Sequence, residues 1–142
     1  GRPRRIIVPQ DGSKHATTII PWAGRLARFH KASVVLLHVS HPGRASKIPG
    51  ELSRASTRLR SQGIKARVCL EEGDPAEQIL HACRAGDLLA ITTHGKGGIK
   101  RLLLGSVAEK VIHEAPAPAM IYKFRAKGRQ RAHDLEAVEL FE

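Results

Sequence analysis

The chain has 142 residues, the size of one domain with a substantial hydrophobic core. Its 24 Lys and Arg residues against 13 Asp and Glu give a formal net charge of +11, which favours anionic partners: nucleotides, nucleic acid or acidic protein surfaces. No apolar run approaches the ~20 residues that cross a bilayer, so we expect no membrane helix. Cys69 and Cys83 lie in apolar segments without metal-ligand spacing, which predicts free thiols and a cytoplasmic protein.

Strand and helix patterns alternate along the chain. Short, largely β-branched apolar runs predict buried strands at 6–8, 33–39, 66–71, 88–91 and 119–122. Helical patterns fill the intervals at 13–30, 51–62, 74–86 and from 106 onward. Capping boxes are predicted at Asp74–Glu77 and Ser106–Glu109. The alternation predicts an α/β fold: a doubly wound, five-stranded parallel sheet with helices on both faces, in the flavodoxin-like order 2-1-3-4-5 or a related one.

The composition changes near the C-terminus. We place one α/β domain over residues 1–124 and a charged tail over 125–142, which lies outside the core and is either irregular or a short helix. The basic run at 125–131 lacks the interleaved aromatic residues of a stacking platform, so we expect a solvated tail rather than nucleic-acid binding.

Two glycine-bearing loops should meet at one edge of this sheet. Loop 9–13 follows the first strand and loop 93–105 follows the fourth, and ligands bind such sheets beyond the carboxyl ends of the strands, where the strand order reverses. No P-loop, dinucleotide fingerprint or nucleophile elbow is present. A phosphate could bind where Gly95 is followed, after nine residues, by Gly105-Ser106 at a helix start. Backbone N–H groups face outward at such a helix start, and glycine allows the backbone to approach a ligand closely. From the residues alone, phosphate binding and a plain capped loop are equally open.

The remaining polar candidates give weaker signals. Lys96, Lys100 and Arg101 add positive charge to the second loop. An Asp in the position of Asp11 serves as a turn residue or as a ligand contact. His38 and His94 are more typical of backbone hydrogen bonding than of acid–base chemistry. We assign no catalytic residue and no metal ligand.

Between Arg4 and Lys123 these motifs together resemble the universal stress protein family. The matching stretches are 6–13 (IIVPQDGS), 36–39 (LLHV), 72–75 (EGDP), 93–98 (THGKGG), 104–108 (LGSVA) and 116–118 (PAP). ATP-binding members carry Gly-x2-Gly-x9-Gly-[Ser/Thr], whereas this chain has Thr92 at the first glycine. The resemblance implies ATP, alone or with Mg²⁺, as the ligand, and a homodimer paired through the strand Ala119–Lys123.

The resemblance also implies roles for particular residues. Asp11 and Val39 would flank the adenine and ribose, and the phosphates would lie against Gly95, Gly105, Ser106 and Val107. Pro9, Ile91 and Thr92 complete the expected site. The branched Thr92 side chain either narrows the pocket or replaces a backbone contact with its hydroxyl group.

Three functions follow, in order of preference. The first is a nucleotide-binding stress-response or regulatory protein with slow or no turnover, acting through a ligand-linked dimer or a protein partner that the sequence does not identify. The second is an interaction module that uses its basic surface without nucleotide. The third is a slow ATP hydrolase, which is weakened because no motif supplies a residue to activate water.

Overall fold

The computed structural model describes residues 1–43, 47–95, 105–125 and 135–141. Its strands are β1 Arg5–Gln10, β2 Ser33–Ser40, β3 Ala66–Glu72, β4 Asp87–Gly95, β5 Ala119–Arg125 and β6 Leu135–Phe141. Its helices are α1 Lys14–Thr17, α2 Ile20–His30, α3 Gly50–Ser61, α4 Pro75–Ala82 and α5 Ser106–Glu114. None of the described helices is long and apolar enough to cross a membrane.

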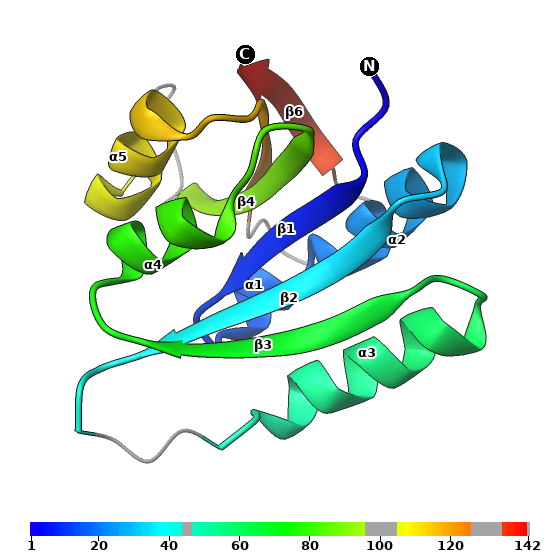
Figure 1. The fold of residues 1–142 in the computed structure, drawn as a ribbon, viewed down its shortest axis with the longest axis horizontal. Coiled ribbons are helices and arrows are strands. Elements are labelled where there is room, and N and C mark those ends of the chain that lie inside the picture. The colour runs from blue at the N-terminus through cyan, green and yellow to red at the C-terminus, as the bar shows by residue number, and fades with distance from the viewer. Residues whose placement is uncertain (44–46, 96–104, 126–134, 142) are drawn as a thin grey trace.

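One sheet organises the molecule (Figure 1), with the strand order β3-β2-β1-β4-β5-β6. The first five strands are parallel to one another, which confirms the predicted fold class. The order differs from 2-1-3-4-5, because β1 lies between β2 and β4 rather than between β2 and β3. The chain therefore winds from β1 toward β3 and then crosses back to the other side of β1, so the order reverses between β1 and β4.

The sixth strand corrects two expectations about the C-terminal part of the chain. Residues 135–141 form β6, antiparallel to β5, and are neither a helix nor a segment outside the sheet. The segment Ala119–Lys123 is consequently not an edge strand, because β5 pairs with β4 on one side and β6 on the other. The weakly alternating apolar pattern of residues 135–141 is compatible with a helix or a strand. The segment forms a strand because β5 offers it an unpaired edge.

Both faces of the sheet are covered, as continuous apolar strands require. Alternate strand residues point to opposite faces. Ile6 and Val8 pack with α2 and α3, whereas Ile7 packs with α4 and α5. Figure 1 shows these two helical layers on either side of the twisted sheet.

Two helices begin where the sequence pattern did not place them. The predicted helix over 13–30 is divided into α1 and α2, and Pro21 lies in the first turn of α2. Proline has no N–H to donate to a carbonyl one turn earlier, which prevents one continuous helix. The N-cap of α5 is Gly105, so Ser106 is the first helical residue rather than the cap. The prediction at Asp74 is confirmed, because its carboxylate accepts a hydrogen bond from Glu77 N at 3.0 Å.

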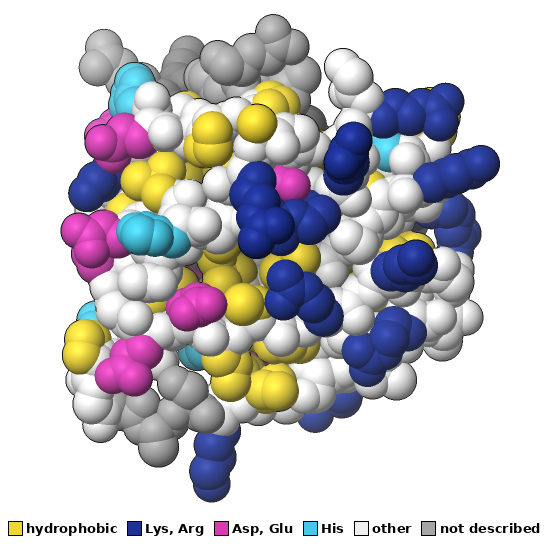
Figure 2. All heavy atoms as spheres, viewed as in Figure 1, with side chains coloured by type: hydrophobic (Ala, Val, Ile, Leu, Met, Phe, Trp, Pro, Cys, Tyr) yellow, Lys and Arg dark blue, Asp and Glu magenta, His cyan; other side chains and the backbone are white. Residues whose placement is uncertain are grey.

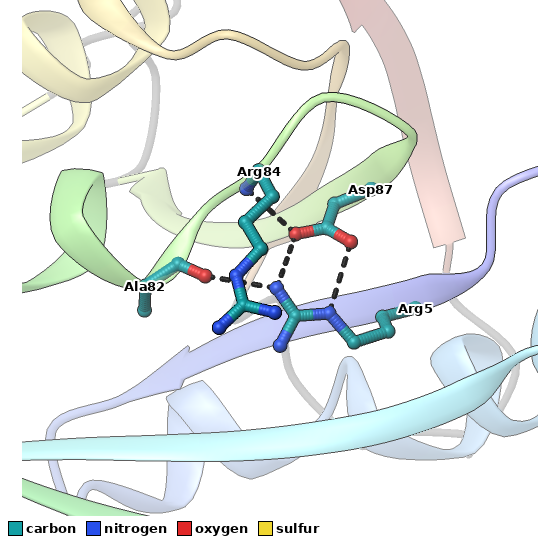
Figure 3. A network of polar contacts seen from close by, with 4 residues as sticks. All are labelled: Arg5, Ala82, Arg84 and Asp87. Atoms are coloured by element: carbon teal, nitrogen blue, oxygen red, sulfur yellow. Dashed lines mark hydrogen bonds and ion pairs between the residues drawn. The ribbon is translucent and has the colours of Figure 1, made fainter.

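A buried ion pair joins β1 and β4 at their amino ends (Figure 3). Arg5 Nε and Nη2 donate to the two carboxylate oxygens of Asp87 at 3.0 and 2.6 Å, and Nη2 also donates to the Ala82 carbonyl at 3.0 Å. The backbone N–H of Arg84 donates to Asp87 Oδ2 at 2.7 Å. The carboxylate raises the pKa of Arg5 through its hydrogen bond, and Asp87 is 4% exposed. This network fixes the end of the sheet opposite the loops that carry the predicted site.

Candidate functional site

The two central strands separate toward their carboxyl ends. β1 is in register with β2 over its whole length, from Arg5 to Gln10. With β4, however, its register covers only Arg5 to Ile7. The crevice expected at a reversal of strand order therefore opens beside Pro9 and Gln10.

A cavity of about 310 Å³ occupies this crevice. Its walls come from β1 and the following loop, from β2 and β4, and from α1, α4 and α5. Apolar side chains dominate the walls, including Leu37, Ile79 and Val111, which belong to the core layer on the α4 and α5 side of the sheet. Asp11 is the single charged side chain among the described lining residues. An apolar slot with few polar groups is typical of a small-molecule site.

The cavity brings most of the predicted binding residues together. Those that line it are Pro9, Asp11, Val39, Ile91, Thr92, Gly105 and Val107. Two predicted residues do not line it: Gly95 is the last residue of β4, and Ser106 is the first residue of α5. Lys96, Lys100 and Arg101, and the side chain of His94, lie outside the described residues. The binding role of each residue remains a prediction.

A tight turn holds Asp11 at the mouth of the cavity. Its carboxylate accepts a hydrogen bond from Ser13 N at 2.8 Å, and Ser13 Oγ accepts one from Ala16 N at 3.1 Å, which caps α1. Gly12 between them has φ +87°, a conformation that favours glycine. Asp11 is thus a turn residue, as one interpretation of the sequence expected, and its position also exposes it to a ligand.

Thr92 lines the cavity, and its hydroxyl group contacts α1. Its hydroxyl group lies 3.5 Å from the carbonyl oxygen of Ala16, a long and therefore weak contact. The same carbonyl accepts a much shorter hydrogen bond from Gln10 Nε2, at 2.7 Å. The methyl and hydroxyl groups of Thr92 therefore take up space beside α1, and the hydroxyl is not committed to a strong bond within the protein.

Helix α5 presents its amino end to the cavity. Gly105 is its N-cap with an extended backbone, and no side chain caps the helix. Among the described residues, a Cβ atom built at Gly105 would meet no heavy atom within 4 Å. The first-turn N–H groups and the positive end of the helix dipole can accept an anion there.

The ring of His38, which lies at the carboxyl end of β2, has a structural partner. Nδ1 of His38 lies 3.0 Å from the carbonyl oxygen of Gln10, which confirms the expected backbone hydrogen bond. Within the described part of the chain, no group of three or more His, Cys, Asp or Glu side chains could hold a metal ion.

Sequence reasoning missed several residues of the cavity wall. Gln10 is buried, at 4% exposure, and holds α1 against β1 through Ala16. Gln10 stands between two predicted site residues, Pro9 and Asp11, and this position could have indicated that it belongs to the cavity wall. The apolar wall contributed by α4 and α5, such as Ile79 and Val111, gave no separate signal, because core positions on a helix show the same periodicity whether they face a sheet or a cavity.

Comparison with known proteins gives a consistent result. The sequence profile of the Universal stress protein family matches residues 3–123. A universal stress protein of Methanocaldococcus jannaschii is 28% identical over 139 residues, covering 84% of this chain and 82% of that protein.

Solved structures share the fold. A universal stress protein in complex with cAMP has a TM-score of 0.68 and 21% identity, over 87% of this chain and 98% of that one. The universal stress protein of Archaeoglobus fulgidus in complex with dAMP has a TM-score of 0.60 and 23% identity, over 85% and 97% of the two chains.

Proposed function

Because the chain belongs to the universal stress protein family, we propose that it binds an adenine nucleotide in the cavity at the carboxyl ends of β1 and β4. The single observation that carries the proposal is the arrangement of this cavity. Its apolar walls suit a planar base, Asp11 lies at its mouth, and the uncapped amino end of α5 borders it at Gly105.

The volume of the cavity suits part of a nucleotide. Small-molecule pockets span about 300–1,000 Å³, and this one, at about 310 Å³, is near the lower limit. We place the base and ribose inside it, between Val39 and Ile91, and the phosphates in front of Gly105 at the amino end of α5. The proteins of this fold that hold cAMP and dAMP make adenine nucleotides the first ligand class to test, with ATP foremost.

We further propose a regulatory role in the stress response rather than fast catalysis. No described cluster of side chains could hold a metal ion alone, so Mg²⁺ would arrive with the phosphates, which together with waters supply most of its ligands.

Cys69 and Cys83 are free, which suits the reducing cytoplasm proposed from the sequence. A homodimer joined at Ala119–Lys123 remains a prediction, and it would require β6 to leave β5.

The replacement of Gly105 by Val tests the site. The substitution suits the backbone, which has φ −62°, and the Cβ atom of the new side chain would meet no heavy atom of the described residues within 4 Å. We expect ATP affinity, measured by titration calorimetry, to fall by at least ~100-fold because the side chain occupies the place of the phosphates. Gly50→Val is the matched control: it makes the same change at an exposed position outside the cavity and should leave the affinity unchanged.

Circular dichroism would establish that both variants are folded. Unchanged ATP affinity in Gly105→Val would show that the phosphates lie elsewhere. Failure of the unaltered protein to bind ATP, ADP or cAMP, together with the absence of any retained nucleotide in native mass spectrometry, would overturn the proposed function.

A further inference from the structure

A second hollow, about 560 Å³ in volume, lies between α2 and α3. It is on the opposite face of the sheet from the nucleotide cavity: its apolar residues Ile20, Leu59 and Ile64 belong to the core layer that includes α2 and α3. Gly24 allows the two helices to approach closely, since a Cβ atom there would lie 2.7 Å from Cδ2 of Leu59. The result is a groove with an apolar floor and helical walls.

Four arginines line this groove. Arg25 and Arg28 come from α2, and Arg54 and Arg58 come from α3. Residues three or four positions apart share one face of a helix, so each pair forms a row along its wall. All four side chains are exposed.

The arginines of α2 are partly fixed in place. The guanidinium carbon of Arg25 lies 4.8 Å from the centre of the Trp22 ring, in a cation–π arrangement. Arg28 Nη2 donates to the carbonyl oxygen of Gln62, the residue that ends α3, at 2.9 Å. A side chain already held near its binding geometry loses less conformational entropy when it binds, so these contacts favour recognition of a partner.

Little negative charge within the described structure balances this groove. The ion pair between Arg5 and Asp87 lies at the amino ends of β1 and β4, away from this groove. Glu51 is the one acidic lining residue, so four Arg less one Glu give the lining a formal charge of +3. Figure 2 shows the same asymmetry over the visible face: Lys and Arg gather on the side where α2 and α3 lie in Figure 1, and Asp and Glu on the side of α4 and α5.

We propose that the groove between α2 and α3 binds an acidic amphipathic helix of a partner protein. The apolar face of that helix lies over Pro21 and Ala55, the apolar lining residues that are not buried, and the arginine rows pair with carboxylates flanking it. A partner helix about as long as α3, which has 12 residues, would be roughly 18 Å long. Nucleic acid fits less well, because none of the lining residues is aromatic and Glu51 would repel phosphates. This inference is independent of nucleotide binding.

The test uses the full chain and a fluorescein-labelled peptide of about 12 residues, with Leu on one helical face and Glu on the others, read by fluorescence anisotropy. The groove variant is Arg54→Gln with Arg58→Gln, which removes two charges and keeps good helix formers. The matched control is Arg67→Gln with Lys110→Gln, which removes two exposed charges outside the groove. We expect the groove variant to bind about tenfold more weakly, and the control to lose less than about twofold.

The outcomes separate specific docking from general charge attraction. Equal losses in both variants would overturn the proposal, as would equal binding of a scrambled peptide with the same composition, because either result shows attraction without a docking surface. Absence of peptide binding would also overturn it. If an oligouridine RNA competes at lower concentrations than the peptide and loses affinity in the groove variant, the surface is a nucleic-acid site and the proposal fails.

Discussion

The cavity beside α5 and the groove between α2 and α3 lie on opposite faces of the same sheet and differ in their linings. The cavity is smaller, about 310 Å³ against about 560 Å³, and only Asp11 among its described lining residues is charged. The groove contains five charged residues, four of them arginines. The cavity therefore presents apolar walls and the amino end of α5, whereas the groove offers charged side chains to solvent.

The difference shows why net charge is a poor guide to a binding site. The excess of +11 favours an anionic ligand but does not locate one. Backbone N–H groups at a helix start can hold a phosphate without any lysine or arginine, so a nucleotide site adds nothing to the net charge. The four arginines of the groove, by contrast, add directly to the net charge, and it is this surface that we propose as a protein-binding one.

The largest expected effect in this comparison is on the free energy of unfolding, and it comes from a substitution that tests whether the two sites are independent of each other. Asp87→Asn removes the charge partner of Arg5 at the amino ends of β1 and β4, away from both sites. We expect the free energy of unfolding in urea to fall by about 2 kcal/mol, because a partly buried guanidinium loses its carboxylate. The affinities for ATP and for the acidic peptide should stay within about twofold of the original values.

Asp74→Asn is the matched control for that measurement. It makes the same chemical change at the exposed N-cap of α4, where Asn caps about as well as Asp, so stability should change by less than ~0.5 kcal/mol. A large change in either affinity in Asp87→Asn would show that the sites are coupled through the sheet, and the comparison would fail.

A smaller effect is expected at Thr92, which belongs to the cavity alone. Thr92→Gly removes a weak contact with Ala16 and a side chain that lies beside α1. ATP affinity should change by ~1 kcal/mol or less, about one neutral hydrogen bond, and peptide affinity should not change. Calorimetry would measure the first and anisotropy the second. A gain well beyond tenfold would mean that Thr92 blocks the cavity and that the original chain does not bind nucleotide usefully.

The last prediction concerns the two thiols, whose rates of modification would provide a reporter for the cavity side of the sheet. Burial, followed by the negative charge of Asp87, raises the pKa of Cys83 from 9.0 to about 11. Its thiol stays protonated at pH 8, so iodoacetamide should modify Cys69 first, by at least about tenfold in rate. Cys69 is opposite Leu37, a cavity residue, and would carry the label there.

Peptide mass spectrometry would identify the modified cysteine. Because the pKa of Cys83 is raised on folding, its contribution to stability is complete below pH 9 and declines as the pH rises toward about 11. Faster modification of Cys83 than of Cys69 at pH 8 would contradict the burial of this thiol.

Much of the fold could be predicted because its signals are local. Val34 to Leu37 form a continuous apolar run, which predicts a strand covered on both faces wherever it lies in the sheet. Asp74 caps α4 through an atom three residues away. The break at Pro21 was also a local signal, but the apolar periodicity of α2 obscured it.

The candidate site could be predicted in part, for the same reason. Asp11 and Gly105 stand in loops at the ends of strands, and the parallel arrangement alone brings those loops to one edge. The walls contributed by Ile79 and Val111 could not be predicted, because their periodicity is that of any core helix.

The sequence by itself determined the five parallel strands, most helix positions, the α/β class and the loops that border the cavity, since each depends on residues close together in the chain. Only the tertiary structure decided the order of the strands, the place of β6 beside β5 and the groove lined by Arg25 and Arg54. The physical reason is distance along the chain. Strands pair through backbone hydrogen bonds, and helices pack through the fit of side chains such as Leu59 against Gly24. In both cases the partner segment is distant in the chain, and no local pattern specifies which segment it will be.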